Sequence, residues 1–122
     1  MKVHTIRLSG PWQRVKEPGA GQRIRLPIDC LAGEETRLMR RFGRPGRLDE
    51  GERVWLVIAG LSGHAQVLLN QSPLALDASL EGMRVDITQW LLRDNWLTID
   101  WSGVESGGLK GPVWLECVTA VE

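Results

Sequence analysis

The sequence predicts an all-β protein, an antiparallel β-sandwich of about eight or nine short strands. Residues 53–61 are apolar on both faces, which is typical of a strand in the middle of a β architecture. Several other short segments alternate apolar and polar residues and are bounded by glycine, proline or asparagine. No segment carries the periodicity of a long helix, and this favours a sandwich over a mixed fold.

The length of the chain limits the number of domains. With 122 residues, the chain fits one domain spanning residues 1–122, and such a domain buries about two thirds of its unfolded surface. No internal repeat or low-complexity segment divides it.

The first half of the chain is expected to hold four strands. They lie at residues 3–8, 12–15, 22–26 and 36–42, with a glycine–proline turn at 18–21 and a loop at 28–35. In the fourth strand Arg40 shares its parity with Leu38 and Phe42. An arginine on an apolar face must find a carboxylate, reach the rim or sit at a β-bulge. A ligand contact is the alternative.

The second half follows the same pattern. Strands are expected at residues 53–61, 65–70, 83–88, 95–101 and 113–121, with a longer excursion at 74–82 and a four-glycine loop at 102–111. Asn70 favours a tight turn in the left-handed conformation. Asp86 or Thr88 is expected to cap a single helical turn at 89–92.

Several short motifs, and the order in which they follow one another along the chain, resemble those of one known family. They are Gly10-Pro11-Trp12, Leu26-Pro27-Ile28-Asp29, Arg40-Arg41-Phe42, Arg53-Val54-Trp55-Leu56, Ala65-Gln66-Val67-Leu68-Leu69-Asn70, Asp86-Ile87-Thr88 and Gly107-Gly108 through Trp114-Leu115. Residues 12–118 thereby resemble the N-terminal jelly-roll domain of family-2 glycoside hydrolases, the β-galactosidase and β-glucuronidase group, in the galactose-binding-like superfamily. The resemblance implies a jelly-roll sandwich with a sugar-binding ancestry.

The departures from that family bear on activity. The family's Asn-Gly is Asn70-Gln71 here, and its histidine and aromatic residues before Asp-Ile-Thr are replaced by residues 76–83. These 122 residues also lack the family's immunoglobulin-like domain and the barrel that carries two catalytic carboxylates. Because glycoside hydrolysis needs both carboxylates, we expect this chain not to be an enzyme.

Charge and composition exclude several partners. Lysine plus arginine equals aspartate plus glutamate at 15 each, so we expect neither nucleic-acid nor membrane binding. Five arginines, Arg37, Arg40, Arg41, Arg44 and Arg47, form a local basic run that we interpret as a solvated face. His4 and His64 have no metal-site spacing, so we expect no metal and no cofactor.

The start of the chain lacks the apolar core of a signal peptide, which predicts a cytoplasmic protein. Cys30 and Cys117 are expected to be buried free thiols, although one disulfide between them is the alternative. Whether a structural Ca²⁺ is bound is left open, because no run of closely spaced aspartates indicates one.

Sugar recognition by a sandwich typically uses an exposed aromatic ring beside polar groups. By strand parity the candidates for carbohydrate contact are Trp12, Trp96 and Trp114, with Arg40 as a polar contact. The resemblance to the glycosidase domain implies a non-catalytic carbohydrate-binding module, which these tryptophans permit. The alternative is an interaction or scaffolding sandwich that binds a protein partner or a second copy of itself.

Overall fold

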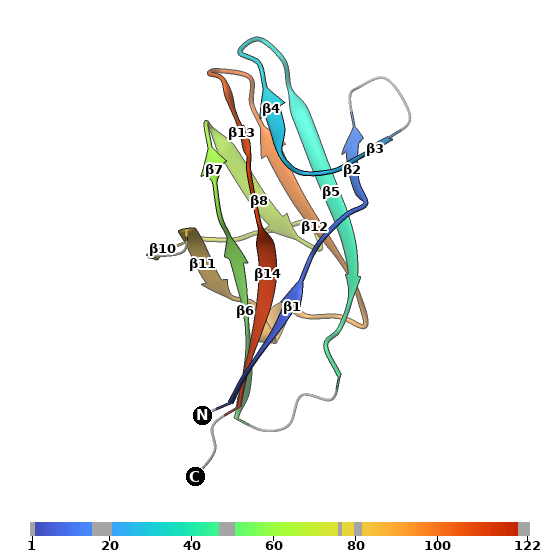
Figure 1. Cartoon of the computed structure of the whole chain (residues 1–122), viewed down its shortest axis with the longest axis vertical. Helices are drawn as coiled ribbons and strands as arrows, with labels where there is room; N and C mark the ends of the chain where they lie inside the picture. Colours follow the sequence, from blue (N-terminus) through green and yellow to red (C-terminus); the bar gives the residue numbers. More distant parts are fainter. Residues whose placement is uncertain (1, 16–20, 47–50, 76, 80–81, 120–122) are drawn as a thin grey trace.

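The computed structural model describes residues 2–15, 21–46, 51–75, 77–79 and 82–119, and it confirms the all-β prediction (Figure 1). Its described part holds fourteen strands and one short 3-10 turn, η1 (Thr88–Trp90). None of its described residues belongs to a helix long and apolar enough to cross a membrane. Parts of the predicted turn at 18–21, the excursion at 74–82 and the loop containing Arg47 lie outside the described residues.

Five strands form the sheet at the front of Figure 1. In spatial order they are β1 (Lys2–Arg7), β14 (Val113–Thr119), β6 (Glu52–Ile58), β11 (Gly82–Asp86) and β10 (Asp77–Ser79). All neighbours are antiparallel. The doubly apolar segment thus forms the central strand β6, as the sequence predicts.

Six strands form the second sheet, which lies behind the first in Figure 1. In spatial order they are β3 (Gln22–Ile24), β2 (Trp12–Val15), β5 (Thr36–Gly43), β12 (Asp94–Trp101), β8 (Ala65–Leu69) and β9 (Ser72–Pro73). β12 pairs with β5 along its whole length, from Asp94 opposite Gly43 to Trp101 opposite Thr36. The regular register leaves no β-bulge at Arg40.

Three short strands close one end of the sandwich. They are β4 (Ile28–Cys30), β13 (Gly107–Leu109) and β7 (Leu61–Ser62), and they lie at the top of Figure 1. The sequence predicts loops where β4 and β13 occur, and it predicts fewer strands in total. Strands of two or three residues are too short to show an alternation, and the two glycines of β13 have no side chains to alternate.

The core lies between the two large sheets. β12 buries Leu97, Ile99 and Trp101, each 2% exposed or less, as their parity predicts. β6 contributes Val54, Leu56 and Ile58, which are fully buried. Burying each such aliphatic side chain contributes about 1.5–3 kcal/mol, so these alternating positions supply much of the driving force for folding.

The turn after β11 departs slightly from the prediction. It is a 3-10 turn that begins at Thr88, and Ile87 occupies the N-cap without a side-chain hydrogen bond to the turn. Asp86 instead accepts hydrogen bonds from the Thr88 amide at 3.0 Å and the Thr88 hydroxyl at 2.6 Å. Thr88 Oγ1 in turn accepts from the Val54 amide at 2.8 Å, so this turn is fastened to β6.

Candidate functional site

The outer face of the six-stranded sheet carries an exposed tryptophan. Trp96 lies on β12 with its side chain directed away from the buried Leu97 and is 37% exposed. It faces Arg41 of β5 across the ladder. Arg41 in turn pairs with Asp94 at 3.3 Å, between side chains that are both largely exposed. Such an exposed pair contributes little to stability.

The backbone of Trp96 is held by one neighbouring residue. Asn70 donates its amide to the Trp96 carbonyl at 2.9 Å and accepts from the Trp96 amide through its side-chain oxygen at 2.9 Å. The left-handed conformation of Asn70, at φ +50°, was predicted from its place in the turn and brings both groups into reach. The ring of Trp96 is therefore presented from a fixed backbone.

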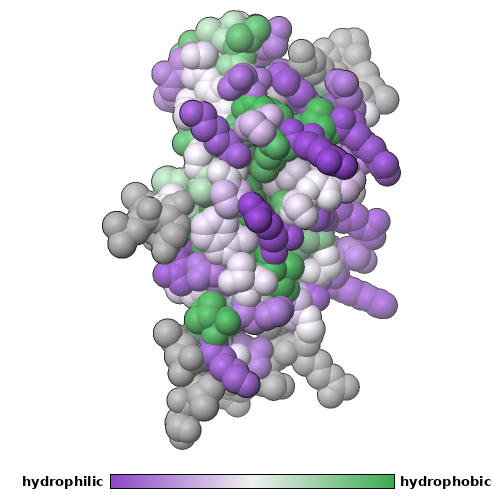
Figure 2. Space-filling model, in the orientation of Figure 1, coloured by the Kyte–Doolittle hydropathy of each residue, from purple (hydrophilic) through white to green (hydrophobic). Residues whose placement is uncertain are grey.

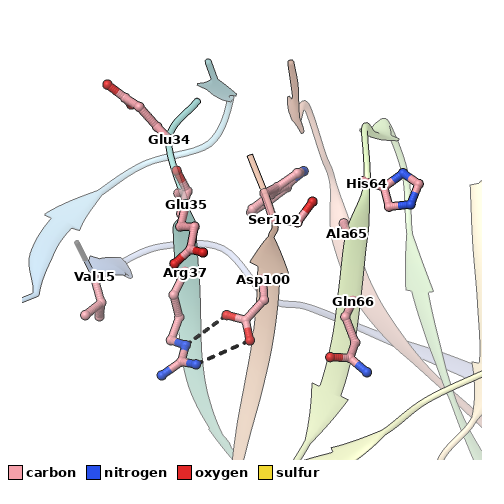
Figure 3. Close-up of a pocket in the computed structure, with 11 residues that line it drawn as sticks. Val15, Glu34, Glu35, Arg37, His64, Ala65, Gln66, Asp100 and Ser102 are labelled. Carbon is pink, nitrogen blue, oxygen red and sulfur yellow. Dashed lines mark hydrogen bonds and ion pairs between the residues drawn. The ribbon is translucent and has the colours of Figure 1, made fainter. Parts of the chain in front are cut away.

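The same face continues into a pocket of about 750 Å³ beyond the middle of β12. Arg37 of β5 donates to Asp100 of β12 through Nε at 2.8 Å and Nη2 at 3.4 Å, and Figure 3 shows these two contacts. Gln66 of β8 lies opposite Asp100 on the other side. The three side chains thus form a polar row across three adjacent strands.

The rim of this pocket is acidic. Glu34 and Glu35 come from the turn that precedes β5, while His64 reaches Glu105 at 3.7 Å. In Figure 3 Glu34 points up and away from the Arg37–Asp100 pair, and His64 points away from the pocket. Trp101 lines the floor, but it is 2% exposed and its indole N–H is bound to the Ser62 carbonyl at 2.9 Å. The floor therefore offers no aromatic face.

The chemistry of this face is polar recognition. Arg37 offers hydrogen-bond donors, Asp100 accepts, and the amide of Gln66 does both, which is the mixture that sugar hydroxyls require. Trp96 lies on the same side of the same strand as Asp100, four residues away, which is about 13 Å at the rise of a β-strand. A short oligosaccharide spans such a distance.

The three predicted tryptophans do not come together. Trp12 is fully buried and donates its indole N–H to the Leu8 carbonyl at 3.2 Å, so the expectation of an exposed ring there is wrong. Its large apolar ring fills the space between the sheets where β2 begins. Trp114 is half-buried on the outer face of the five-stranded sheet, opposite Val57 and Arg7. Only Trp96 lies on the face with the pocket.

Arg40 resolves the alternatives left open by the sequence. Its side chain points to the inner side of β5, where Nε donates to the Ser9 carbonyl at 2.8 Å and Nη1 donates to the Arg41 carbonyl. No carboxylate among the described residues forms an ion pair with it. Burial lowers the pKa of its guanidinium. Arg40 binds backbone, and it does not line the pocket beside Arg37.

The sequence missed the polar row. Arg37 was noticed only as one member of a basic run, and Asp100 and Gln66 carried no motif. Their matching parity on β5, β12 and β8 was available, but the order of those strands in the sheet was not. A carboxylate and an arginine on adjacent strands can be recognised only once the register is known.

The cysteines are free. Cys30 is buried and Cys117 is half-buried, and no disulfide joins them. Burial raises the pKa of both thiols, and the charge of Glu52 adds to the effect at Cys117. Both therefore remain protonated and unreactive at neutral pH. Among the described residues no group of three or more histidine, cysteine or carboxylate side chains is arranged to hold a metal ion.

Comparisons with known proteins agree on the fold. No family model matches this sequence, and no curated protein matches it. Solved structures of larger glycosidases do superpose on nearly the whole chain. An FMN-binding β-glucuronidase from Facaelibacterium prausnitzii L2-6 matches 96% of this chain at 22% identity and a TM-score of 0.75. A β-glucuronidase from an uncultured Clostridium species matches 96% at 15% identity and a TM-score of 0.73.

A putative β-galactosidase from Bacteroides fragilis matches 98% of this chain at 18% identity and a TM-score of 0.71. The chain shares its fold with a sandwich domain of family-2 glycosidases. The resemblance seen in the sequence motifs is thereby confirmed at the level of fold. The chain spans 23%, 29% and 24% of these three enzymes, about a quarter of their length.

Proposed function

We propose that this chain is a non-catalytic carbohydrate-binding module that holds a short oligosaccharide on the outer face of the six-stranded sheet. The observation that carries the proposal is the exposed, backbone-fixed ring of Trp96 on the same strand face as the Arg37–Asp100 pair. The ring packs on the apolar side of one sugar. The polar row of Arg37, Asp100 and Gln66 forms hydrogen bonds with the hydroxyls of another sugar unit of the same oligosaccharide.

The fold match supports the same class of function. The sandwich that superposes belongs to enzymes named for their action on sugars, and it makes up only a part of each. A sandwich that superposes on part of a glycosidase is suited to binding, while catalysis by that family requires two carboxylates on opposite sides of one glycosidic bond.

The direct test is isothermal titration calorimetry with a panel of neutral mono- and oligosaccharides, after a glycan array has ranked them. Trp96→Ala is expected to raise the dissociation constant of the tightest-binding sugar at least about tenfold, equivalent to about 1.4 kcal/mol of binding free energy. Trp96→Phe, which keeps a flat ring, should retain part of the affinity. Asp100→Asn should also weaken binding, because it breaks the pair that orients Arg37.

Trp90→Ala is the matched control. Trp90 is 43% exposed, comparable to Trp96, but it lies on η1 and not on β12. Its carbonyl accepts from the Asn70 side chain at 3.4 Å, and this backbone contact is kept when the ring is removed. If Trp90→Ala binds the sugar as the wild type does and Trp96→Ala binds it more weakly, the sugar contacts the ring of Trp96. A silent array together with no heat at millimolar sugar, or equal binding by wild type and Trp96→Ala, would exclude the proposal.

The outer face of the five-stranded sheet favours a second function, protein interaction. Val57 of β6 points to this outer side yet is fully buried, between the opposing side chains of Trp114 on β14 and Arg84 on β11. Arg84 also lies over the ring of Trp55, 4.1 Å from its centroid. Tryptophan and arginine are the residues most enriched at binding hot spots.

The view in Figure 2 is from the side of this five-stranded sheet, and hydrophobic residues appear there in small separate groups among hydrophilic ones. Such a surface fits a modest contact with a partner or a second copy better than an obligate interface. Multi-angle light scattering checks the self-association. A concentration-dependent dimer that Trp114→Ala abolishes supports this function, and a monomer at all concentrations counts against self-association.

A further inference from the structure

A second groove, of about 860 Å³, lies at the open side of the sandwich. There β1, the edge strand of the five-stranded sheet, meets β3, the edge strand of the six-stranded sheet. The chain crosses from one sheet to the other along residues 8–11 and forms the bottom of the groove. Leu8, Trp12 and Val113 supply its apolar floor, and each is 3% exposed or less.

The walls of this groove carry only positive charge. Arg7 and Lys110 lie on one side and Arg23 and Arg25 on the other, and no aspartate or glutamate is among its lining residues. Among the described residues none of these four cations takes part in an ion pair. In a chain of zero formal charge, four cations around one groove create a local positive potential.

Hydrogen bonds to residues at the bottom of the groove hold its shape. Arg40, on the inner side of β5, donates to the carbonyl of Ser9, a lining residue of the groove. The Leu8 amide donates to the Val113 carbonyl at 2.9 Å, which joins two residues of the floor. The half-buried charge of Arg40, which forms no ion pair with a carboxylate in the part of the chain that the structure describes, adds to the potential beneath the cations.

We propose that this groove binds an acidic glycan, an extended chain bearing carboxylate or sulfate groups. Arg23 and Arg25 are two residues apart, so their Cα atoms are separated by about 7 Å along an extended backbone. An extended ligand with recurring anionic groups can meet both of them, while Arg7 and Lys110 contact it from the other wall. Guanidinium groups bind carboxylate and sulfate oxygens through paired hydrogen bonds.

Two other polyanions fit the groove less well. Single-stranded nucleic acid needs exposed aromatic rings on which bases stack, and the tryptophan of this groove, Trp12, is fully buried. An acidic peptide that binds as an added strand needs a run of backbone N–H donors. Pro11 and Pro112 stand in the lining and have none.

The test is affinity measured at low ionic strength for four probes: oligogalacturonate, dextran sulfate, uncharged dextran and poly-glutamate. We expect saturable binding of the first two, weakened by added salt because the cations are exposed. The Arg23→Gln/Arg25→Gln double variant should bind them at least about tenfold more weakly. Whichever of carboxylate and sulfate binds more tightly identifies the natural group.

The matched control is the Arg44→Gln/Arg93→Gln double variant. It removes the same charge from two exposed arginines that do not line the groove. Equal weakening by both double variants would mean non-specific attraction and would overturn the proposal, as would no binding of either acidic glycan. Tighter binding of poly-glutamate than of both glycans would overturn it in favour of a peptide. Trp96→Ala should leave binding here unchanged, so this result is independent of the sugar site on the six-stranded sheet.

Discussion

Arg40 donates a hydrogen bond from Nε to the carbonyl of Ser9, 2.8 Å away, and so ties β5 to the segment that crosses between the two sheets. The arginine occupies an inward position between Leu38 and Phe42, both buried. Its apolar stem can pack with them while its head reaches the edge of the sandwich. This arrangement is one of the structural roles that the sequence allowed for an arginine on an apolar face.

Arg40→Met should loosen the crossover. The substitution keeps an apolar side chain of similar length but removes the hydrogen bond to Ser9, at a cost of about 0.5–1.5 kcal/mol. Hydrogen exchange of the Leu8 amide, which is bound to Val113, should accelerate more than exchange in β12. Equal protection of Leu8 in both proteins would show that Arg40 only fills space.

Asn95→Ala should be among the more destabilising single changes. Asn95 is fully buried. Its side chain accepts from the Leu92 amide at 2.8 Å and from Asn70 at 3.0 Å, and it donates to the Leu92 carbonyl at 2.9 Å. Alanine leaves these partners unsatisfied, so urea unfolding should show a loss of about 1–3 kcal/mol.

Asp94→Ala is the control for that measurement. It sits next to Asn95, but its ion pair with Arg41 is exposed. The free energy of unfolding of Asp94→Ala should therefore differ from that of the wild type by no more than about 0.5 kcal/mol. If the two variants prove equally stable, the buried amide network does not hold this end of β12.

Gln71→Gly should stabilise the protein. Gln71 has φ +70°, in the left-handed region that favours glycine, and its side chain is exposed. Glycine removes a strain of about 1 kcal/mol, partly offset by greater freedom in the unfolded chain. Thermal unfolding should therefore shift upward. Asn70→Gly, at φ +50° in the same turn, should not stabilise, because it deletes the side-chain contact with Trp96.

Asp86 should make stability depend on pH. Burial alone would raise the pKa of its carboxyl, but hydrogen bonds from Thr88 and Arg53 and the charge of Arg53 outweigh burial and lower it. The unfolded chain therefore binds the proton more readily than the folded one. The stabilisation is full above the ordinary pKa of about 3.9 and is lost as the pH falls through the folded-state value.

Urea unfolding of wild type and Asp86→Asn, repeated from neutral pH downward, measures this effect. The variant should be less stable at neutral pH, and the difference should shrink below the ordinary carboxyl range. A difference that stays constant down to acid pH would mean that the hydrogen bonds with Thr88, and not the charge, account for the loss.

Much of the fold was predictable because it follows from local alternation. The parity of β12 identified Leu97 and Ile99 as core, and both are fully buried. The two apolar faces of β6 indicated a central strand, which it is. The turn at Asn70 was predictable from its residue type. Strands β4 and β13 were not predictable, because three-residue pairings depend on which distant segment lies alongside.

The candidate sites were predictable only in part, since parity tells which side of a strand a residue faces but not which sheet lies behind it. Trp96 and Trp114 were both correctly placed on outer faces, although the two faces belong to different sheets, while Trp12 proved to belong to the core. The basic groove was not foreseen, because Arg7, Arg23 and Lys110 lie far apart in sequence.

By itself the sequence determined that this chain forms an antiparallel sandwich, which residues of its regular strand β12 face the core, and that the chain turns at Asn70. These features depend on the two-residue period of a strand and on the backbone preferences of single residues, both of which are local. Only the tertiary structure decided that Arg37 and Asp100 meet, that Arg40 holds Ser9, and that four cations surround one groove. Those relationships require the order and register of strands, which arise when distant segments pair to bury a shared core.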